Sequence, residues 1–152
     1  MGTFDRNQLE ELDRAIEIGR EVYYSLKHAE EKLNRAMDFG AADMLFANFI
    51  TSSIKHRKIA EANKEIERAR LCLQSLNRHL DRTVLPESLS VQVSEIGRFA
   101  DIFFASRIMD VYYQDKINDA LDQIEKSKEE VKKVVQELKK YRSLEQNVVA
   151  EV

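Results

Sequence analysis

The sequence has almost none of the residues that break or turn a chain, with one proline and four glycines among 152 residues. Tryptophan is absent, and Cys72 is the single cysteine. Sandwiches, barrels and doubly wound sheets need many more turns than these residues supply, so such folds are disfavoured. One cysteine can form neither an intrachain disulfide nor a Cys-x-x-Cys metal site.

Long apolar runs are missing as well. The most apolar stretches are residues 44–54 and 102–105, whereas a helix that crosses a bilayer needs about 20 apolar residues. Residues 1–12 contain Asp5, Glu10 and Glu11 and lack the apolar segment of a secretion signal. Together with the single cysteine, these features predict a cytoplasmic protein without a membrane span.

Charge of either sign is abundant, but neither sign dominates. The chain has 24 basic and 27 acidic residues and a net charge of -3, which disfavours a general nucleic-acid binder. Charged residues make up 34% and hydrophobic residues 43% of the chain, a composition typical of long amphipathic helices. We therefore expect residues 1–152 to form a single all-α domain.

The first predicted helix covers about residues 5–38. Apolar residues recur there at alternating intervals of three and four, as they do on one face of a helix. Beside this stripe, small side chains spaced one heptad apart allow a second helix to approach closely in the antiparallel direction: Ala15, Val22, Ala29 and Ala36. Asp5 is the expected N-cap, and Gly40 is expected just after the C-terminus of the helix.

Two more long helices are predicted, at about residues 41–82 and 94–141, joined by a connector or short helix over 83–98. Pro86 marks the break between them. In the earlier helix, the apolar stripe consists of Ile59, Ala62, Ile66, Ala69, Leu73, Leu76 and Leu80. In the later one, the matching stripe consists of Ile117, Ala120, Ile124, Ser127, Val131, Val134 and Leu138.

These two stripes belong to an internal match between residues 42–80 and 100–138, in which eleven of thirty-nine aligned residues are identical. A duplication would explain the match, and so would two helices with similar packing duties, because a shared heptad phase raises any such score. On either explanation, the two segments should pack alike.

The predicted fold is an antiparallel bundle of long amphipathic helices with coiled-coil-like packing. Two arrangements remain open. One has three long helices and one short helix. The other is an up-down four-helix bundle, in which the last segment breaks near residues 109–114.

No catalytic or metal-binding motif is present. Glu-x-x-His, His-Glu-x-x-His, glycine-rich phosphate loops and Gly-x-Ser-x-Gly are all missing. Cys72 lies two helical turns from His79, too far for activation along one helix, and His28 with Glu31 is the one near pair of metal ligands built on a histidine. We therefore predict no catalytic residue, no metal and no cofactor.

Aromatic residues gather in residues 39–54 and 99–113, two segments that are apolar on more than one face. Such segments must be covered by a core, by a second copy of the chain or by a partner helix. The candidate interaction surface consists of Phe46, Phe49, Phe103, Phe104, Tyr112 and Tyr113.

The function expected from the sequence is that of a non-enzymatic structural or adaptor protein that works by protein–protein association. The expected partners are a second copy of the chain, most simply in a dimer, and a helix of another protein. A small-molecule-binding bundle is the first alternative, and a weak association with nucleic acid is the second.

Overall fold

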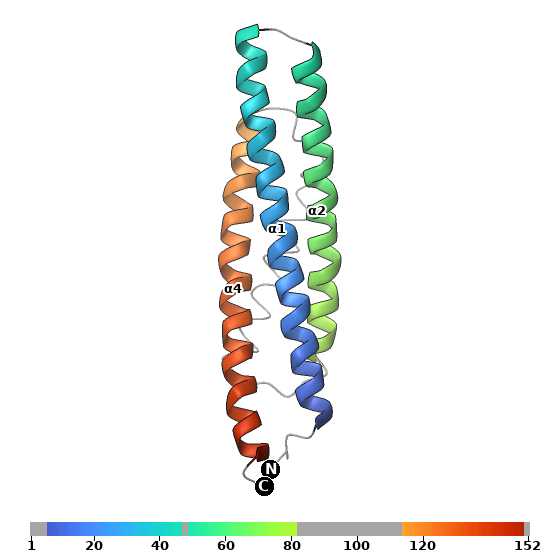
Figure 1. Ribbon diagram of the computed structural model, residues 1–152, viewed down its shortest axis with the longest axis vertical. Coiled ribbons are helices and arrows are strands. Elements are labelled where there is room, and N and C mark those ends of the chain that lie inside the picture. Colours follow the sequence, from blue (N-terminus) through green and yellow to red (C-terminus); the bar gives the residue numbers. More distant parts are fainter. Residues whose placement is uncertain (1–5, 47–48, 82–113, 151–152) are drawn as a thin grey trace.

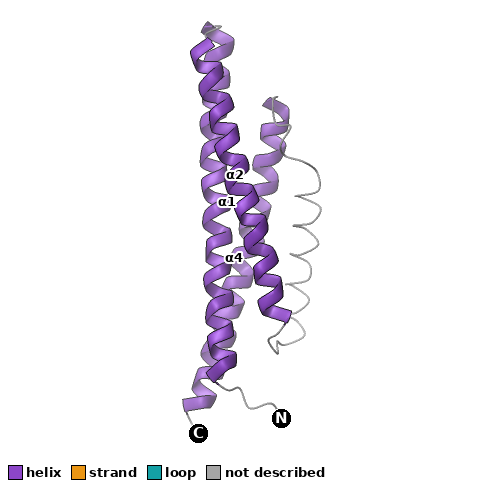
Figure 2. Cartoon of the chain, turned by 90° about the vertical axis from the view of Figure 1, so that its right-hand side faces the viewer, coloured by secondary structure: helices purple, strands orange, loops and turns teal. Residues whose placement is uncertain are grey.

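Three long helices make up the described part of the chain in the computed structural model. They are α1 (Arg6–Phe46), α2 (Phe49–Asp81) and α4 (Gln114–Ala150). The structure describes residues 6–46, 49–81 and 114–150, and side-chain burial over 6–38, 56–80 and 117–144. Within these ranges all secondary structure is helical (Figure 2), which confirms the predicted all-α fold class.

The helix α1 lies between the other two and packs against both of them. It runs antiparallel to α2 and to α4, so that α1 begins and α4 ends at the same end of the molecule (Figure 1). At a rise of 1.5 Å per residue, the 41 residues of α1 span about 60 Å. The described helices therefore form an elongated rod, none of them long and apolar enough to span a membrane.

The buried face of α1 follows a heptad pattern with positions a and d at its centre. One row consists of Leu12, Gly19, Leu26 and Leu33, and the other consists of Ala15, Val22, Ala29 and Ala36. Every member of both rows is buried, so the small residues predicted to allow close approach do lie in the core. A helix with two neighbours needs a wide apolar face, which these two rows provide.

The predicted stripes of α2 and α4 are buried over their whole length. All seven residues from Ile59 to Leu80 are in the core, and so are all seven from Ile117 to Leu138, including Ser127. The hydroxyl of Ser127 donates a hydrogen bond of 2.8 Å to the carbonyl of Gln123, which lets a polar side chain lie in an apolar stripe. Both helices pack on α1, while the similar packing of the two repeat segments and a duplication of the chain stay predictions.

Three of the predicted helix boundaries differ from those in the structure. The helix α1 continues through Gly40 to Phe46, because glycine inside a helix costs only about 1 kcal/mol and the residues after it favour helix. The helix α4 continues past Tyr141 to Ala150, since the loss of heptad phase there introduces no helix breaker. The helix α2 begins at Phe49 rather than near residue 41.

Several sequence-based expectations concern segments outside the described residues. These are the connector at 83–98, residues 94–113 of the last predicted helix with the break expected near 109–114, and residues 100–113 of the internal match. The choice between three long helices with one short helix and an up-down four-helix bundle rests on these segments, so both arrangements remain predictions.

Candidate functional site

The aromatic surface predicted from the sequence lies almost entirely outside the described residues. Phe46 is the last residue of α1 and Phe49 is the first residue of α2, and only their backbone is described. The other four residues of that surface fall outside the described ranges: Phe103, Phe104, Tyr112 and Tyr113.

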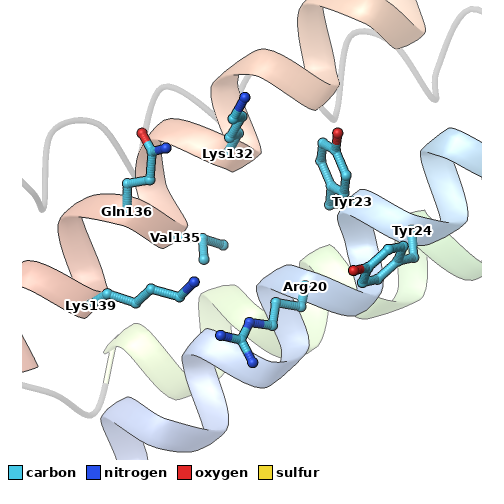
Figure 3. A pocket seen from close by; sticks show the side chains of 7 residues that line it. All are labelled: Arg20, Tyr23, Tyr24, Lys132, Val135, Gln136 and Lys139. Carbon is cyan, nitrogen blue, oxygen red and sulfur yellow. The ribbon is translucent and has the colours of Figure 1, made fainter.

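A groove between α1 and α4 combines aliphatic, aromatic and cationic side chains. Its volume is about 260 Å³. The side chains that line it are Arg20, Tyr23, Tyr24, Lys132, Val135, Gln136 and Lys139 (Figure 3). We call this feature the α1/α4 groove.

A close approach of the two helices places Val135 at the α1/α4 groove. A Cβ atom built on Gly19 would lie 2.6 Å from Cγ2 of Val135, so a larger residue at position 19 would push the helices apart. Val135 itself is buried and belongs to the core. The groove therefore has an aliphatic floor that is continuous with the packed interior.

Two adjacent tyrosines form the aromatic part of the groove on α1. The ring centroids of Tyr23 and Tyr24 are 5.8 Å apart with an interplanar angle of 78°, an edge-to-face arrangement. Tyr23 packs against the core, whereas 55% of Tyr24 is exposed. Tyr23 can thus hold the orientation of Tyr24, whose ring is open to a binding partner.

Three cations line the same groove, namely Arg20 from α1 with Lys132 and Lys139 from α4 (Figure 3). No carboxylate belongs to the lining, and none of the three forms an ion pair with a residue that the structure describes. The groove is therefore locally positive on a chain whose net charge is -3.

Carboxylates join the cations beyond one end of the groove. A second hollow shares Arg20 and Lys139 with it but is also lined by Asp13 and Glu17. Arg142 forms an ion pair with Asp13, with Nη2 donating to Oδ2 at 3.2 Å, and this hydrogen bonding raises the pKa of Arg142. Beyond this end of the groove, the two carboxylates therefore offset part of the positive charge.

A buried lysine joins the same two helices further along. Nζ of Lys128 lies 2.9 Å from Glu30 on α1 and 3.1 Å from Glu125 on α4, and its side chain is only 11% exposed. Burial alone would lower the pKa of Lys128, but the hydrogen bonds to both carboxylates outweigh it and raise that pKa. These three side chains form a structural ion cluster, because the buried lysine is satisfied by the carboxylates on both sides of it.

The residues that could have supported nucleophilic catalysis are engaged elsewhere. The thiol of Cys72 lies 3.7 Å from Oε2 of Glu21, and its pKa is raised by burial and then by that carboxylate. Nδ1 of His79 lies 2.8 Å from Oε2 of Glu11. A thiol with a raised pKa is a poor nucleophile, and the histidine that could activate it faces a carboxylate instead.

The near pair of metal ligands has no further ligand beside it. Nδ1 of His28 and Oε2 of Glu31 lie 3.7 Å apart on the surface of α1. Across residues 6–46, 49–81 and 114–150 there is no cluster of three or more histidine, cysteine, aspartate or glutamate side chains that could hold a metal ion. The pair is therefore a contact on the exposed surface of α1.

Sequence reasoning missed the α1/α4 groove, although part of its signal is visible. Lys132, Gln136 and Lys139 are spaced four and three residues apart and so share one face of a helix. Arg20 precedes the tyrosine pair by one turn of the other helix. The sequence did not reveal that these two faces are neighbours, because that depends on the register of α1 against α4.

Comparisons with known proteins assign the chain to no family. No protein-family model, no curated protein and no solved structure matches the chain.

Proposed function

We propose that this chain is a non-enzymatic helical bundle that works by protein–protein association, as a structural or adaptor protein. The observation that carries the proposal is the α1/α4 groove, in which an exposed tyrosine and three cations without described partners surround an aliphatic floor. Tyrosine and arginine are enriched at the energetic centres of protein interfaces. A rigid surface between two packed helices needs little reordering when a partner binds.

The two alternatives derived from the sequence have less support. Small-molecule sites usually bury most of the ligand, whereas this groove leaves Tyr24 half exposed. A nucleic-acid backbone needs a continuous positive track, and here Asp13 and Glu17 lie next to the cations. A thermal-shift screen of small ligands and retention on heparin test these alternatives.

Self-association in a reducing compartment is part of the proposal. A second copy of the chain is the simplest partner, and a dimer is the simplest assembly. The free thiol of Cys72 is half-buried and supports a location in the cytoplasm, where thiols stay reduced.

Light scattering coupled to size exclusion, over a range of protein concentrations, tests self-association. We expect a species larger than the 17.7 kDa monomer. Tyr24→Ala probes the groove, and Leu71→Ala is the matched control, because Leu71 is an exposed apolar residue on α2. Loss of the dimer in Tyr24→Ala alone would place the self-contact at the groove. A monomer at every concentration would contradict self-association, and a monomer that also binds no polypeptide through the groove would overturn the proposed function.

A further inference from the structure

We infer that the α1/α4 groove binds an acidic amphipathic helix of another protein, whose carboxylates pair with Lys132 and Lys139 and whose apolar side chain packs on Val135 and Tyr24. This inference rests on the proposed function, since it names the chemistry of the partner for the same groove.

The spacing of the two lysines matches the repeat of a helix. Lys132 and Lys139 are seven residues apart on α4, which places them two turns and about 10 Å apart along the helix axis. Val135 lies between them on the groove floor (Figure 3). A partner helix lying along the groove would need two carboxylates seven residues apart to reach Lys132 and Lys139. An apolar residue three or four positions after the first carboxylate would then lie over Val135.

The residues from α1 complete the site on the opposite side. The exposed ring of Tyr24 offers apolar contact area and a hydroxyl, and Arg20 adds a third cation with a fork of donors that suits a carboxylate. The partner helix would then contact α1 and α4 together and pack in the groove as a third helix.

The described surface of this chain does not supply such a helix. Its pairs of described acidic side chains seven residues apart are Glu10 and Glu17, Glu31 and Asp38, Asp122 and Glu129, and Glu130 and Glu137. Between the members of each pair, the third and fourth positions hold polar or charged residues, or the buried Val134. Within the described part of the chain, a second copy therefore lacks the apolar contact that the groove floor requires, and a different protein is the better match.

Fluorescence anisotropy with synthetic peptides tests the inference. The probe is a labelled helical peptide with glutamates seven residues apart and leucines at the third and fourth positions between them. The control peptide has glutamine in place of both glutamates. We expect the acidic peptide to bind about tenfold more tightly than the control, and we expect binding to weaken as salt is raised from low to physiological concentration.

Two double variants of α4 locate the contact. Lys132→Glu with Lys139→Glu should weaken binding of the acidic peptide by about tenfold or more. Lys133→Glu with Lys140→Glu makes the same change in net charge one residue away, outside the groove lining, and should leave binding within about twofold of the original. Circular dichroism of both variants checks that the helices are intact.

Each other outcome overturns the inference in a different way. Equal binding of both peptides, lost in Tyr24→Ala, would show a groove that recognises polypeptide without acidic side chains, and the proposed function would stand. If the protein binds neither peptide, and Tyr24→Ala disrupts its dimer, the groove would be the contact site of a second copy of the chain. Tighter binding of a single-stranded oligonucleotide would assign it to nucleic acid. If the acidic peptide binds both double variants and Tyr24→Ala as tightly as the original protein, the groove is not the binding site. The proposed function would then lose the groove as its support.

Discussion

Gly19 shows how one residue can set the distance between two helices. Glycine is usually a poor choice inside a helix, and replacing it with alanine is expected to gain about 1 kcal/mol from propensity alone. Here the added Cβ would lie 2.6 Å from Val135, a buried and β-branched side chain with little freedom to move. We expect Gly19→Ala to lower the free energy of unfolding by about 1–2 kcal/mol, as overpacked cores do. Urea denaturation of both proteins measures this difference in the free energy of unfolding.

The double variant Gly19→Ala with Val135→Ala tests whether the contact with Val135 causes the loss of stability. Val135→Ala removes the methyl groups that Gly19→Ala would meet, so the two changes together should destabilise the protein less than the sum of the single changes, with a coupling of about 1 kcal/mol. A Gly19→Ala variant that is more stable than the original protein would show that helix propensity outweighs the contact.

Lys128 offers a second test at the scale of a residue. Lys128→Met keeps the length of the side chain but leaves Glu30, whose side chain is only 24% exposed, without its cation. We expect a loss of about 1–3 kcal/mol in the free energy of unfolding. The control is Lys126→Met, because Lys126 is 62% exposed and pairs with Asp122 at the surface. That change should stay within about 0.5 kcal/mol. Equal stability of the two variants would contradict a stabilising role for the buried pair.

At the scale of the helices, ion pairs on α2 and α4 make stability depend on acid pH. Hydrogen bonds from Lys32 and Lys128 lower the pKa of Glu61 and Glu125, respectively. A carboxyl whose pKa is lowered by folding stabilises the protein above its unfolded value of about 4.3, and that contribution is lost as the pH falls through the folded pKa. We expect the urea midpoint to decrease from pH 5 to pH 3. The decrease should be smaller in Glu61→Gln with Glu125→Gln, and an equal decrease would assign the pH dependence to other groups.

Much of the arrangement of these helices could be predicted from the sequence, because periodicity reports burial directly. The stripes of α2 and α4 were predicted residue by residue. On α1 the row of small residues predicted to allow a close approach, with Ala15 and Val22 in it, is buried as well. An alanine carries little hydrophobic signal, yet it lies at the closest contact because it is small. The helix ends were missed because Gly40 and the loss of phase after Tyr141 are weak stop signals.

The candidate site could not be predicted in the same way. The α1/α4 groove joins Tyr24 to Lys139, residues that are more than a hundred positions apart in the sequence. Periodicity gives the buried face of each helix but not which exposed residues of two helices lie side by side, since that depends on register. The register is fixed by contacts such as Gly19 with Val135 and Glu30 with Lys128. The earlier aromatic surface stays a prediction for residues outside the described ranges.

At the scale of the whole molecule, the antiparallel order of α1 and α4 can be tested by crosslinking. Asp13 and Arg142 form an ion pair, so cysteines at these two positions should react rapidly with a short bifunctional maleimide in a Cys72→Ser background. Cysteines at Asp13 and Lys126 are the control, because Lys128 lies beside Glu30, about 25 Å along α1 from residue 13. Efficient crosslinking of the control pair instead would refute this register.

The central place of α1 also bears on the order in which the molecule assembles. The helices α1 and α2 are joined by residues 47 and 48 alone, whereas 32 residues separate the end of α2 from the start of α4. Closing the short connection costs less chain entropy, so the α1–α2 hairpin should form first, and it can do so during synthesis before α4 has been made. The face of α1 that later receives α4, with Ile16 and Gly19 on it, is then open to solvent. During that interval the nascent hairpin is the species most exposed to aggregation and to chaperones.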